Sequence, residues 1–367
     1  MNRDVKLTPA RPRLAAGLNV GLLIIALAAT ASAQGYRVIN LVSDVPGVAR
    51  NEDTNLVNAW GLEIGHDGNL IVSATETSQA RFYEADGTPK EFSIAVEEEP
   101  TGVVINRFPR HFPIGEGAAA RPSQLIFVTE EGTILGWNPH VERDEAVVAV
   151  DNSASEAVYK GVAQAWTRHG PRLYAANFRG GRVEVYDGAF HSVGAFTDPG
   201  VDPGFSPFDI ANIGGLLYVT FAKPALPDME DDEPGPGNGF VDIFTPDGHL
   251  LRRLISHGPL NSPWGLALAP RHFGRLGGAL LVGNFGDGKI NAFHPWTGAF
   301  LGSLNGEDGA PIQIPGLWAL KFGNGSDRED DHSFGDDDDD GPVLYFTAGP
   351  ANESHGLVGV IIPPNRF

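Results

Sequence analysis

The 367-residue chain contains no cysteine, and this absence removes several kinds of structure and chemistry. Without thiols there is no disulfide bond, no thiolate metal site, no cysteine nucleophile and no lipid-modified cysteine. The sequence also lacks a Gly-rich phosphate loop, a G-x-S-x-G nucleophile elbow and an H-E-x-x-H metalloprotease motif. The fold must therefore be stabilised by apolar burial and by hydrogen-bonded strands.

Positive charge is scarce, since 26 Lys and Arg stand against 46 Asp and Glu, which gives a formal net charge of −20. Such a surface repels the phosphates of nucleic acids and of anionic lipids. We therefore expect no nucleic-acid partner, and we expect a monomer that binds a small molecule or an extracytoplasmic protein. The acidity serves solubility in this interpretation, and attraction of divalent cations or basic partners is the alternative.

Residues 1–33 have the three parts of a secretory signal peptide. Four basic side chains precede an apolar run at 14–29, and Ala31-Ser32-Ala33 forms a small-residue cleavage site. We expect cleavage after Ala33 and a mature domain of residues 34–367 in the periplasm or outside the cell. An uncleaved anchor is the alternative, because residues 14–33 are just long enough to cross a bilayer. No later segment is long and apolar enough to span after the signal is removed.

A short motif, typified by Trp-Gly, recurs six times along the chain. The copies are Trp60-Gly61, Thr101-Gly102, Lys160-Gly161, Phe208-Asp209, Trp264-Gly265 and Trp318-Ala319. Short strand patterns with alternating hydrophobicity and glycine-bearing turns follow each copy. One such sheet cannot bury both of its faces alone, whereas sheets stacked around an axis bury them against each other. The sequence therefore predicts an all-β fold, a six-bladed β-propeller whose blades have strands a to d from the axis outward.

The N-terminal strand is predicted to close the ring. The sixth repeat supplies only three strands before the chain ends, and residues 36–42 form an additional strand pattern that can supply the fourth. Two acidic insertions interrupt the repeat, one at 228–239 and one at 324–341. Runs of like charge are usually solvated and mobile loops, with weak Ca²⁺ binding as the alternative, although the ligand spacing of an EF-hand is absent.

Five segments carry a resemblance to known families: Asn55-Leu56-Val57-Asn58-Ala59-Trp60-Gly61-Leu62, Ala176-Asn177-Phe178-Arg179-Gly180-Gly181, Leu260-Asn261-Ser262-Pro263-Trp264-Gly265-Leu266, Gly283-Asn284-Phe285-Gly286-Asp287-Gly288 and Phe346-Thr347-Ala348-Gly349-Pro350. Through them the chain resembles the NHL-type propellers and, more closely, an uncharacterised family of exported bacterial propellers. It is more remotely similar to the gluconolactonase-like propellers. That resemblance implies a divalent cation such as Ca²⁺, held in the central channel by carboxylates and asparagines. One ligand of that family comes from the first inner strand, where Glu63 is the nearest match.

The d–a and b–c loops of a meander propeller share one face, here called the top. The candidate ligand-binding residues on this face are Glu76, Glu130, Lys160, Asn177, Asp209, Asn284, Glu353 and His355. The oxygen donors among them that suit a hard cation are Glu76, Glu130, Asn177, Asp209 and Asn284. Structural roles are the alternative, since asparagine before a glycine turn bonds nearby backbone. An acid–base pair of Glu353 and His355 is a further possibility.

These observations leave three functions open. The first is a noncatalytic exported binding module that uses the top face and the channel mouth. The second is a lactonase-like hydrolase that depends on a divalent cation, and the third is a structural cell-surface or matrix protein. Trp60, Trp264 and Trp318 are expected to pack between blades, with a stacking platform for a sugar or another ring as the alternative.

Overall fold

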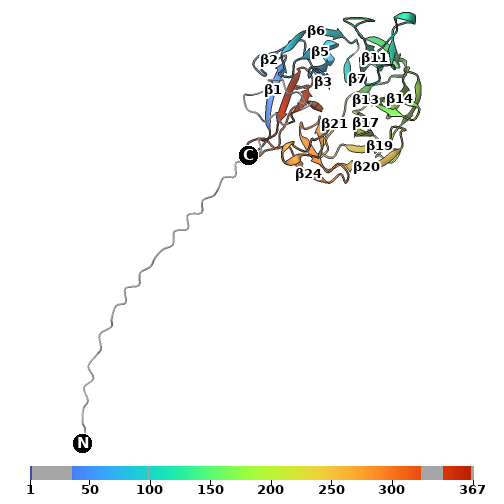
Figure 1. The fold of residues 1–367 in the computed structure, drawn as a ribbon. Helices are drawn as coiled ribbons and strands as arrows, with labels where there is room; N and C mark the ends of the chain where they lie inside the picture. The colour runs from blue at the N-terminus through green and yellow to red at the C-terminus, as the bar shows by residue number, and fades with distance from the viewer. Residues whose placement is uncertain (2–34, 98, 324–341, 365–367) are drawn as a thin grey trace. The chain divides into compact units, whose positions relative to one another are not determined.

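The repeated motif forms the innermost strand of each of six sheets in the computed structural model, which describes residues 1, 35–97, 99–323 and 342–364. These strands are β3 (Ala59–Ile64), β7 (Pro100–Ile105), β13 (Tyr159–Thr167), β17 (Ser206–Ile213), β21 (Pro263–Leu268) and β25 (Leu317–Phe322). Consecutive inner strands contact one another in this order, and β25 contacts β3. The sheets therefore surround one axis (Figure 1), and the prediction of a six-bladed β-propeller is confirmed.

Three further antiparallel strands extend each of the first five blades outward. They are β4 (Leu70–Ala74), β5 (Gln79–Tyr83) and β6 (Pro89–Ala95); β10 (Leu125–Thr129), β11 (Thr133–Trp137) and β12 (Val147–Asp151); β14 (Gly170–Asn177), β15 (Arg182–Asp187) and β16 (Ser192–Phe196); β18 (Leu216–Ala222), β19 (Phe240–Phe244) and β20 (Leu250–Ser256); β22 (Leu280–Asn284), β23 (Ile290–Phe293) and β24 (Phe300–Ser303). The loops add a ribbon of β8 (Pro113–Ile114) with β9 (Arg121–Pro122), and the 3₁₀ turns η1 (Thr75–Thr77), η2 (Gly117–Ala119), η3 (Ser153–Ser155) and η4 (Gly274–Leu276).

The glycine of the motif lets neighbouring inner strands approach closely at the axis. A Cβ added at Gly61 would overlap the carbonyl oxygen of Thr101, and one added at Gly161 would overlap the Asp209 carboxylate. The ladder between strands a and b also shifts register at the motif in every blade, which marks a bulge that redirects the side chains. At Gly61 and Gly161 an added side chain would therefore push two blades apart.

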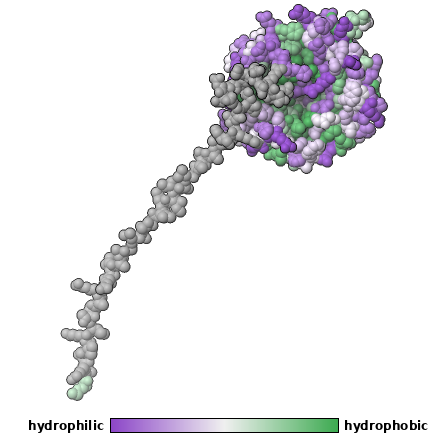
Figure 2. All heavy atoms as spheres, in the orientation of Figure 1, coloured by the Kyte–Doolittle hydropathy of each residue, from purple (hydrophilic) through white to green (hydrophobic). Residues whose placement is uncertain are grey.

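Apolar side chains fill each interface between blades. Ile71 of the first blade packs with Leu125 and Phe127 of the second, and five comparable clusters fill the other interfaces. In the face that Figure 2 shows, apolar side chains gather toward the centre of the ring and polar ones toward its outside. Each sheet thus buries both faces against its neighbours, which is the main source of stability in a chain without disulfides.

The N-terminal strand closes the ring, as predicted. β1 (Arg37–Ser43) pairs antiparallel with β27 (Leu357–Ile362), which itself pairs with β26 (Leu344–Ala348) next to β25. A fifth strand that the sequence did not predict, β2 (Asn51–Glu52), adds to β1 in parallel. Both ends of the described domain therefore belong to one sheet.

The first acidic insertion lies between β18 and β19, in a b–c connection, as predicted. It folds back on the propeller, because Glu230 pairs with Arg179 at 3.2 Å and Glu233 pairs with Lys223 at 2.8 Å. The second insertion (324–341) and the signal region (2–34) lie outside the described residues, so their assignments stay predictions. No helix in the described segments has the length and apolarity needed to cross a bilayer.

Candidate functional site

Aromatic side chains close the top of the axis. The first residue of the motif is Trp60, Trp264 or Trp318 in three blades, and all three are buried. The Trp60 and Trp318 rings stack with centroids 3.6 Å apart, and Phe285 stacks on Trp318 at 4.0 Å. Because the rings pack on one another, they form a floor beneath the top face. This arrangement supports the packing interpretation and leaves no free face of Trp60 or Trp318 for a ring-shaped ligand.

Lys160 occupies the same motif position in the third blade and is 1% exposed. Its Nζ lies 4.8 Å from the centroid of the Trp60 ring and forms an ion pair with Glu130. A buried ammonium is stable only when it is paired. Burial alone lowers the pKa of Lys160, but the Glu130 carboxylate raises it above the usual value. The structure thus brings two of the predicted residues together as a buried ion pair.

Glu353 lies beside this pair on an unusual turn. Between β26 and β27, Ala351, Asn352 and Glu353 have φ of 58°, 54° and 65°. Left-handed backbone costs about 1–2 kcal/mol per L-residue, and such strain is often found at functional sites. Glu353 Oε2 accepts a hydrogen bond of 2.7 Å from Asn58 Nδ2. Burial raises the pKa of Glu353 to about 7, although nearby Lys160 opposes the rise. The carboxyl is therefore held at one place and titrates near neutrality.

Further carboxyls surround Glu353 and the Lys160–Glu130 pair. Glu99 directly precedes β7, and its pKa is raised by burial and then by the charges of Glu130 and Glu76. The insertion contributes Asp231, whose charge raises the pKa of both Glu130 and Glu353. The name carboxyl cluster is used below for Glu99, Glu130, Asp231 and Glu353 with their central Lys160. Its negative charge exceeds what one ammonium can balance.

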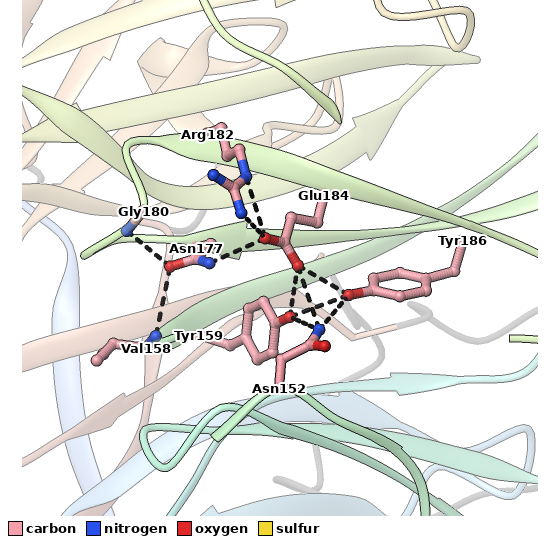
Figure 3. Close-up of polar contacts among 8 residues, drawn as sticks. All are labelled: Asn152, Val158, Tyr159, Asn177, Gly180, Arg182, Glu184 and Tyr186. Carbon is pink, nitrogen blue, oxygen red and sulfur yellow. Dashed lines mark hydrogen bonds and ion pairs between the residues drawn. The ribbon is translucent and has the colours of Figure 1, made fainter. Parts of the chain in front are cut away.

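Asn177 has a structural role. Its Nδ2 donates to Glu184 Oε1 at 3.0 Å and its Oδ1 accepts from the Gly180 backbone nitrogen at 2.8 Å (Figure 3). Glu184 also accepts hydrogen bonds from the hydroxyls of Tyr159 and Tyr186, at 2.6 and 2.8 Å. Asn177 is therefore held by its own blade and is separate from the carboxyl cluster.

Three other candidates also lie apart from the cluster. Asn284 donates to the carbonyl oxygen of Pro259 at 2.8 Å, which joins the end of β22 to the connection between the fourth and fifth blades. His355 Nδ1 lies 2.7 Å from Asp44 Oδ2, so the predicted pairing of His355 with Glu353 does not form. Glu76 is exposed within η1 and acts on the cluster only through its charge on Glu99.

Asp209 lies in the channel rather than on the top face where the sequence placed it. It is the fourth residue of β17 and lines an axial cavity of about 510 Å³. Burial raises the pKa of Asp209 to about 7. The hydrogen bond from the Ile210 backbone nitrogen and the charge of Lys321 have the opposite, smaller effect on this pKa. Glu63 lines the same cavity and pairs with Lys321 at 2.6 Å. Sequence reasoning did not identify this ion pair. The only signal in the sequence is that residues 63 and 321 occupy equivalent positions in the first and sixth copies of the motif.

The five predicted cation ligands do not converge. Glu130 is paired with Lys160, Asp209 lies in the cavity, and the other three have the separate surroundings described above. Across the described ranges, no group of three His, Asp or Glu residues is arranged to hold a metal ion. The arrangement that the structure does show is an anionic mouth over an aromatic floor.

Comparison with known proteins shows which fold the chain shares and which proteins it is related to. No protein-family model matches the chain, so its resemblance to NHL repeats stays a prediction. A solved structure of streptogramin B lyase has a TM-score of 0.51 at 11% identity, covering 90% of this chain and 99% of that one, which shows the fold alone.

Two Acanthamoeba polyphaga mimivirus proteins, Uncharacterized protein L690 and Uncharacterized protein R648, are each 30% identical to the chain over 343 residues. The alignments cover 89% of this chain and 86% and 80% of the viral proteins. These relatives are viral rather than bacterial, and their names carry no activity. The chain belongs to the same family of proteins as mimivirus L690 and R648.

Proposed function

We propose that the protein is an exported binding module that holds a small organic cation in the carboxyl cluster. One observation carries the proposal: Glu353 lies near Lys160 and Glu130, and Glu99 lies near Glu130, while Glu130 already neutralises the Lys160 ammonium. Neither Glu99 nor Glu353 forms an ion pair with any described residue. A ligand with an amine or guanidinium would supply the positive charge that the site lacks.

The aromatic floor contributes to the site through Lys160 rather than through a free ring face. Trp60 already has one ammonium, that of Lys160, 4.8 Å from its ring centroid. Cations near tryptophan faces are stabilised by the ring quadrupole, more so where water is excluded. The carboxyl cluster thus combines negative charge with partial burial, which strengthens electrostatic attraction relative to the open surface.

Export is part of the proposal and is supported by the sequence of residues 1–33, with its basic, apolar and small-residue parts. An acidic, cysteine-free propeller is compatible with the periplasm or the extracellular space. The cation-dependent hydrolase is ranked lower, because among the described residues no three His, Asp or Glu side chains are grouped so that they could hold its ion.

Titration calorimetry of the mature protein with spermidine tests the site. We expect binding that weakens as salt is added, because the attraction is electrostatic. Glu353→Gln should weaken it about tenfold, as expected for loss of one partly buried charge contact. Glu91→Gln is the matched control, since Glu91 is exposed on β6. Equal affinities of the two variants would overturn the site, and binding of Ca²⁺ but not of spermidine would overturn the ligand class.

A further inference from the structure

Two neighbouring connections on the bottom face carry positive charge, although the protein as a whole is acidic. The connection between β7 and β10 contains Arg107 and Arg110, and the turn between β13 and β14 contains Arg168. All three residues are exposed. They form no ion pair with any residue in the part of the chain that the structure describes. In a protein with a net charge of −20, these arginines are therefore available to an anionic partner.

An open tryptophan lies beside these arginines. Trp166, near the end of β13, is 61% exposed. Its ring centroid lies 5.7 Å from that of Phe108 and 6.1 Å from that of His111. Because Phe108 and His111 belong to the connection that carries Arg107 and Arg110, this contact brings the indole and the arginines onto one surface. The name basic aromatic patch is used below for the five residues Arg107, Phe108, Arg110, Trp166 and Arg168.

Both connections are held in place by their own contacts. Phe112, which follows His111, is fully buried and anchors the first connection to the core. Asn106 donates from Nδ2 to the carbonyl oxygen of His111 at 3.1 Å, which closes this part of the loop. In the second connection, Thr167 Oγ1 donates to the carbonyl oxygen of Gly170 at 2.9 Å. A surface fixed in this way loses little conformational freedom when it binds.

The patch combines two kinds of recognition. A guanidinium binds carboxylates and similar oxyanions through two parallel hydrogen bonds. The open surface of Trp166 stacks on flat apolar surfaces, such as the C–H face of a sugar ring. The matching ligand therefore carries both anionic groups and rings.

A polymer of uronic acids meets both requirements, since each ring carries one carboxylate. The headgroups of phosphatidylserine and phosphatidylglycerol offer charge without a ring. A nucleic acid offers both, but its closely spaced phosphates are repelled by a protein with a net charge of −20. The observations thus favour the polysaccharide over the other two polyanionic partners.

We propose that the basic aromatic patch binds an acidic polysaccharide composed of uronic acids. One sugar ring stacks on Trp166, and carboxylates of neighbouring rings pair with the arginines of the patch. The carboxyl cluster lies on the top face and takes a cation, so either proposal can fail without the other.

Calorimetry of the mature protein with polygalacturonate, alginate and hyaluronate tests the ligand class. At least one of these polymers should bind, and its binding should weaken as salt is added, because opposite charges attract. The methyl ester of the tightest binder keeps the chain without the charges and should bind at least tenfold more weakly. Equal binding of the ester, or no binding by any of the three polymers, overturns the proposal. So does single-stranded DNA or a phosphatidylglycerol vesicle that binds as tightly as the best polymer.

Matched variants test the place of binding. Trp166→Ala removes the stacking surface and should weaken the best polymer about tenfold. Its control is Trp296→Ala, since Trp296 is 64% exposed between β23 and β24, outside the patch. Arg168→Gln should weaken the polymer about threefold, as expected for one exposed charge contact, with Arg37→Gln, at an exposed arginine of β1, as its control. Equal affinities of either variant and its control show that the polymer binds elsewhere and overturn the site.

Discussion

Asn58 and Glu353 are 295 positions apart and are joined by a hydrogen bond of 2.7 Å from Asn58 Nδ2 to Glu353 Oε2. The same asparagine accepts from Trp318 Nε1 at 3.0 Å through its Oδ1. Asn58 therefore ties the first blade to the last blade and connects the carboxyl cluster to the aromatic floor. It is fully buried and has a φ of 50°, a conformation that asparagine tolerates better than most residues.

Replacement of Asn58 should be costly for stability. Asn58→Ala leaves the indole N–H of Trp318 without its acceptor and removes the donor to Glu353, so we expect a loss of about 2–4 kcal/mol in the free energy of unfolding. Urea unfolding followed by tryptophan fluorescence measures it. Asn55→Ala, at an exposed asparagine three positions earlier, is the control and should change stability little. A loss of the same small size in both variants would contradict the structural role of Asn58.

The titration of Glu353 should control cation binding. Its pKa of about 7 reflects burial, the opposing charge of Lys160, repulsion from Glu130 and Asp231, and the hydrogen bond from Asn58. As the pH rises through 7 the carboxyl gains its charge, so spermidine should bind more tightly at pH 8 than at pH 6. Glu353→Gln should remove most of this difference. If Glu353→Gln kept the full pH dependence of spermidine binding, another titrating group would be responsible for it.

Stability should respond to Glu353 in the opposite direction. A carboxyl whose pKa is raised in the folded state stabilises the fold below its usual pKa, and this contribution is lost as the pH rises toward the folded value. We therefore expect the wild type to lose stability relative to Glu353→Gln between about pH 4.5 and pH 7. Denaturant unfolding of both proteins at several pH values gives the difference, and a flat difference across this window would refute the raised pKa.

Glu184 should make the stability of the fold depend on pH in the opposite sense to Glu353. Burial alone would raise the pKa of Glu184. Four hydrogen-bond donors outweigh this effect and hold the pKa below the usual value of 4.5 (Figure 3), namely Tyr159, Tyr186, Asn177 and Arg182. Its contribution to stability is present above that value and is lost as the pH falls through the lower folded pKa. Glu184→Gln should therefore be less stable than the wild type at pH 7, and the gap should narrow in acid. Equal acid sensitivity in both proteins would contradict this account.

The blade count and the ring closure could be predicted from the sequence because both depend on local patterns. The motif around Trp60 and Trp264 repeats, and a repeat that is one strand short requires a partner strand. The position of Asp209 could not be predicted, because the bulge in each inner strand changes which side chains face the channel. The carboxyl cluster was found only in part, since Glu130, Lys160 and Glu353 were named but Glu99 and Asp231 join them through loops whose course the sequence pattern does not specify.

The closing strand gives the final prediction. β1 pairs with β27 along its length, for example Val38 with Ile361, and it contributes the fully buried Leu41 and Val42 to the interface of the first and last blades. Deletion of residues 34–43 would expose the edge of β27 and remove this apolar packing, and exposed edges pair with other chains. We expect the deleted protein to aggregate and to unfold at a lower temperature than the mature protein. Removal of residues 1–33 alone is the control and should leave a monomer. Size-exclusion chromatography with light scattering distinguishes the outcomes, and a monomeric deletion variant with unchanged melting would show that the ring is held closed by the blade contacts alone.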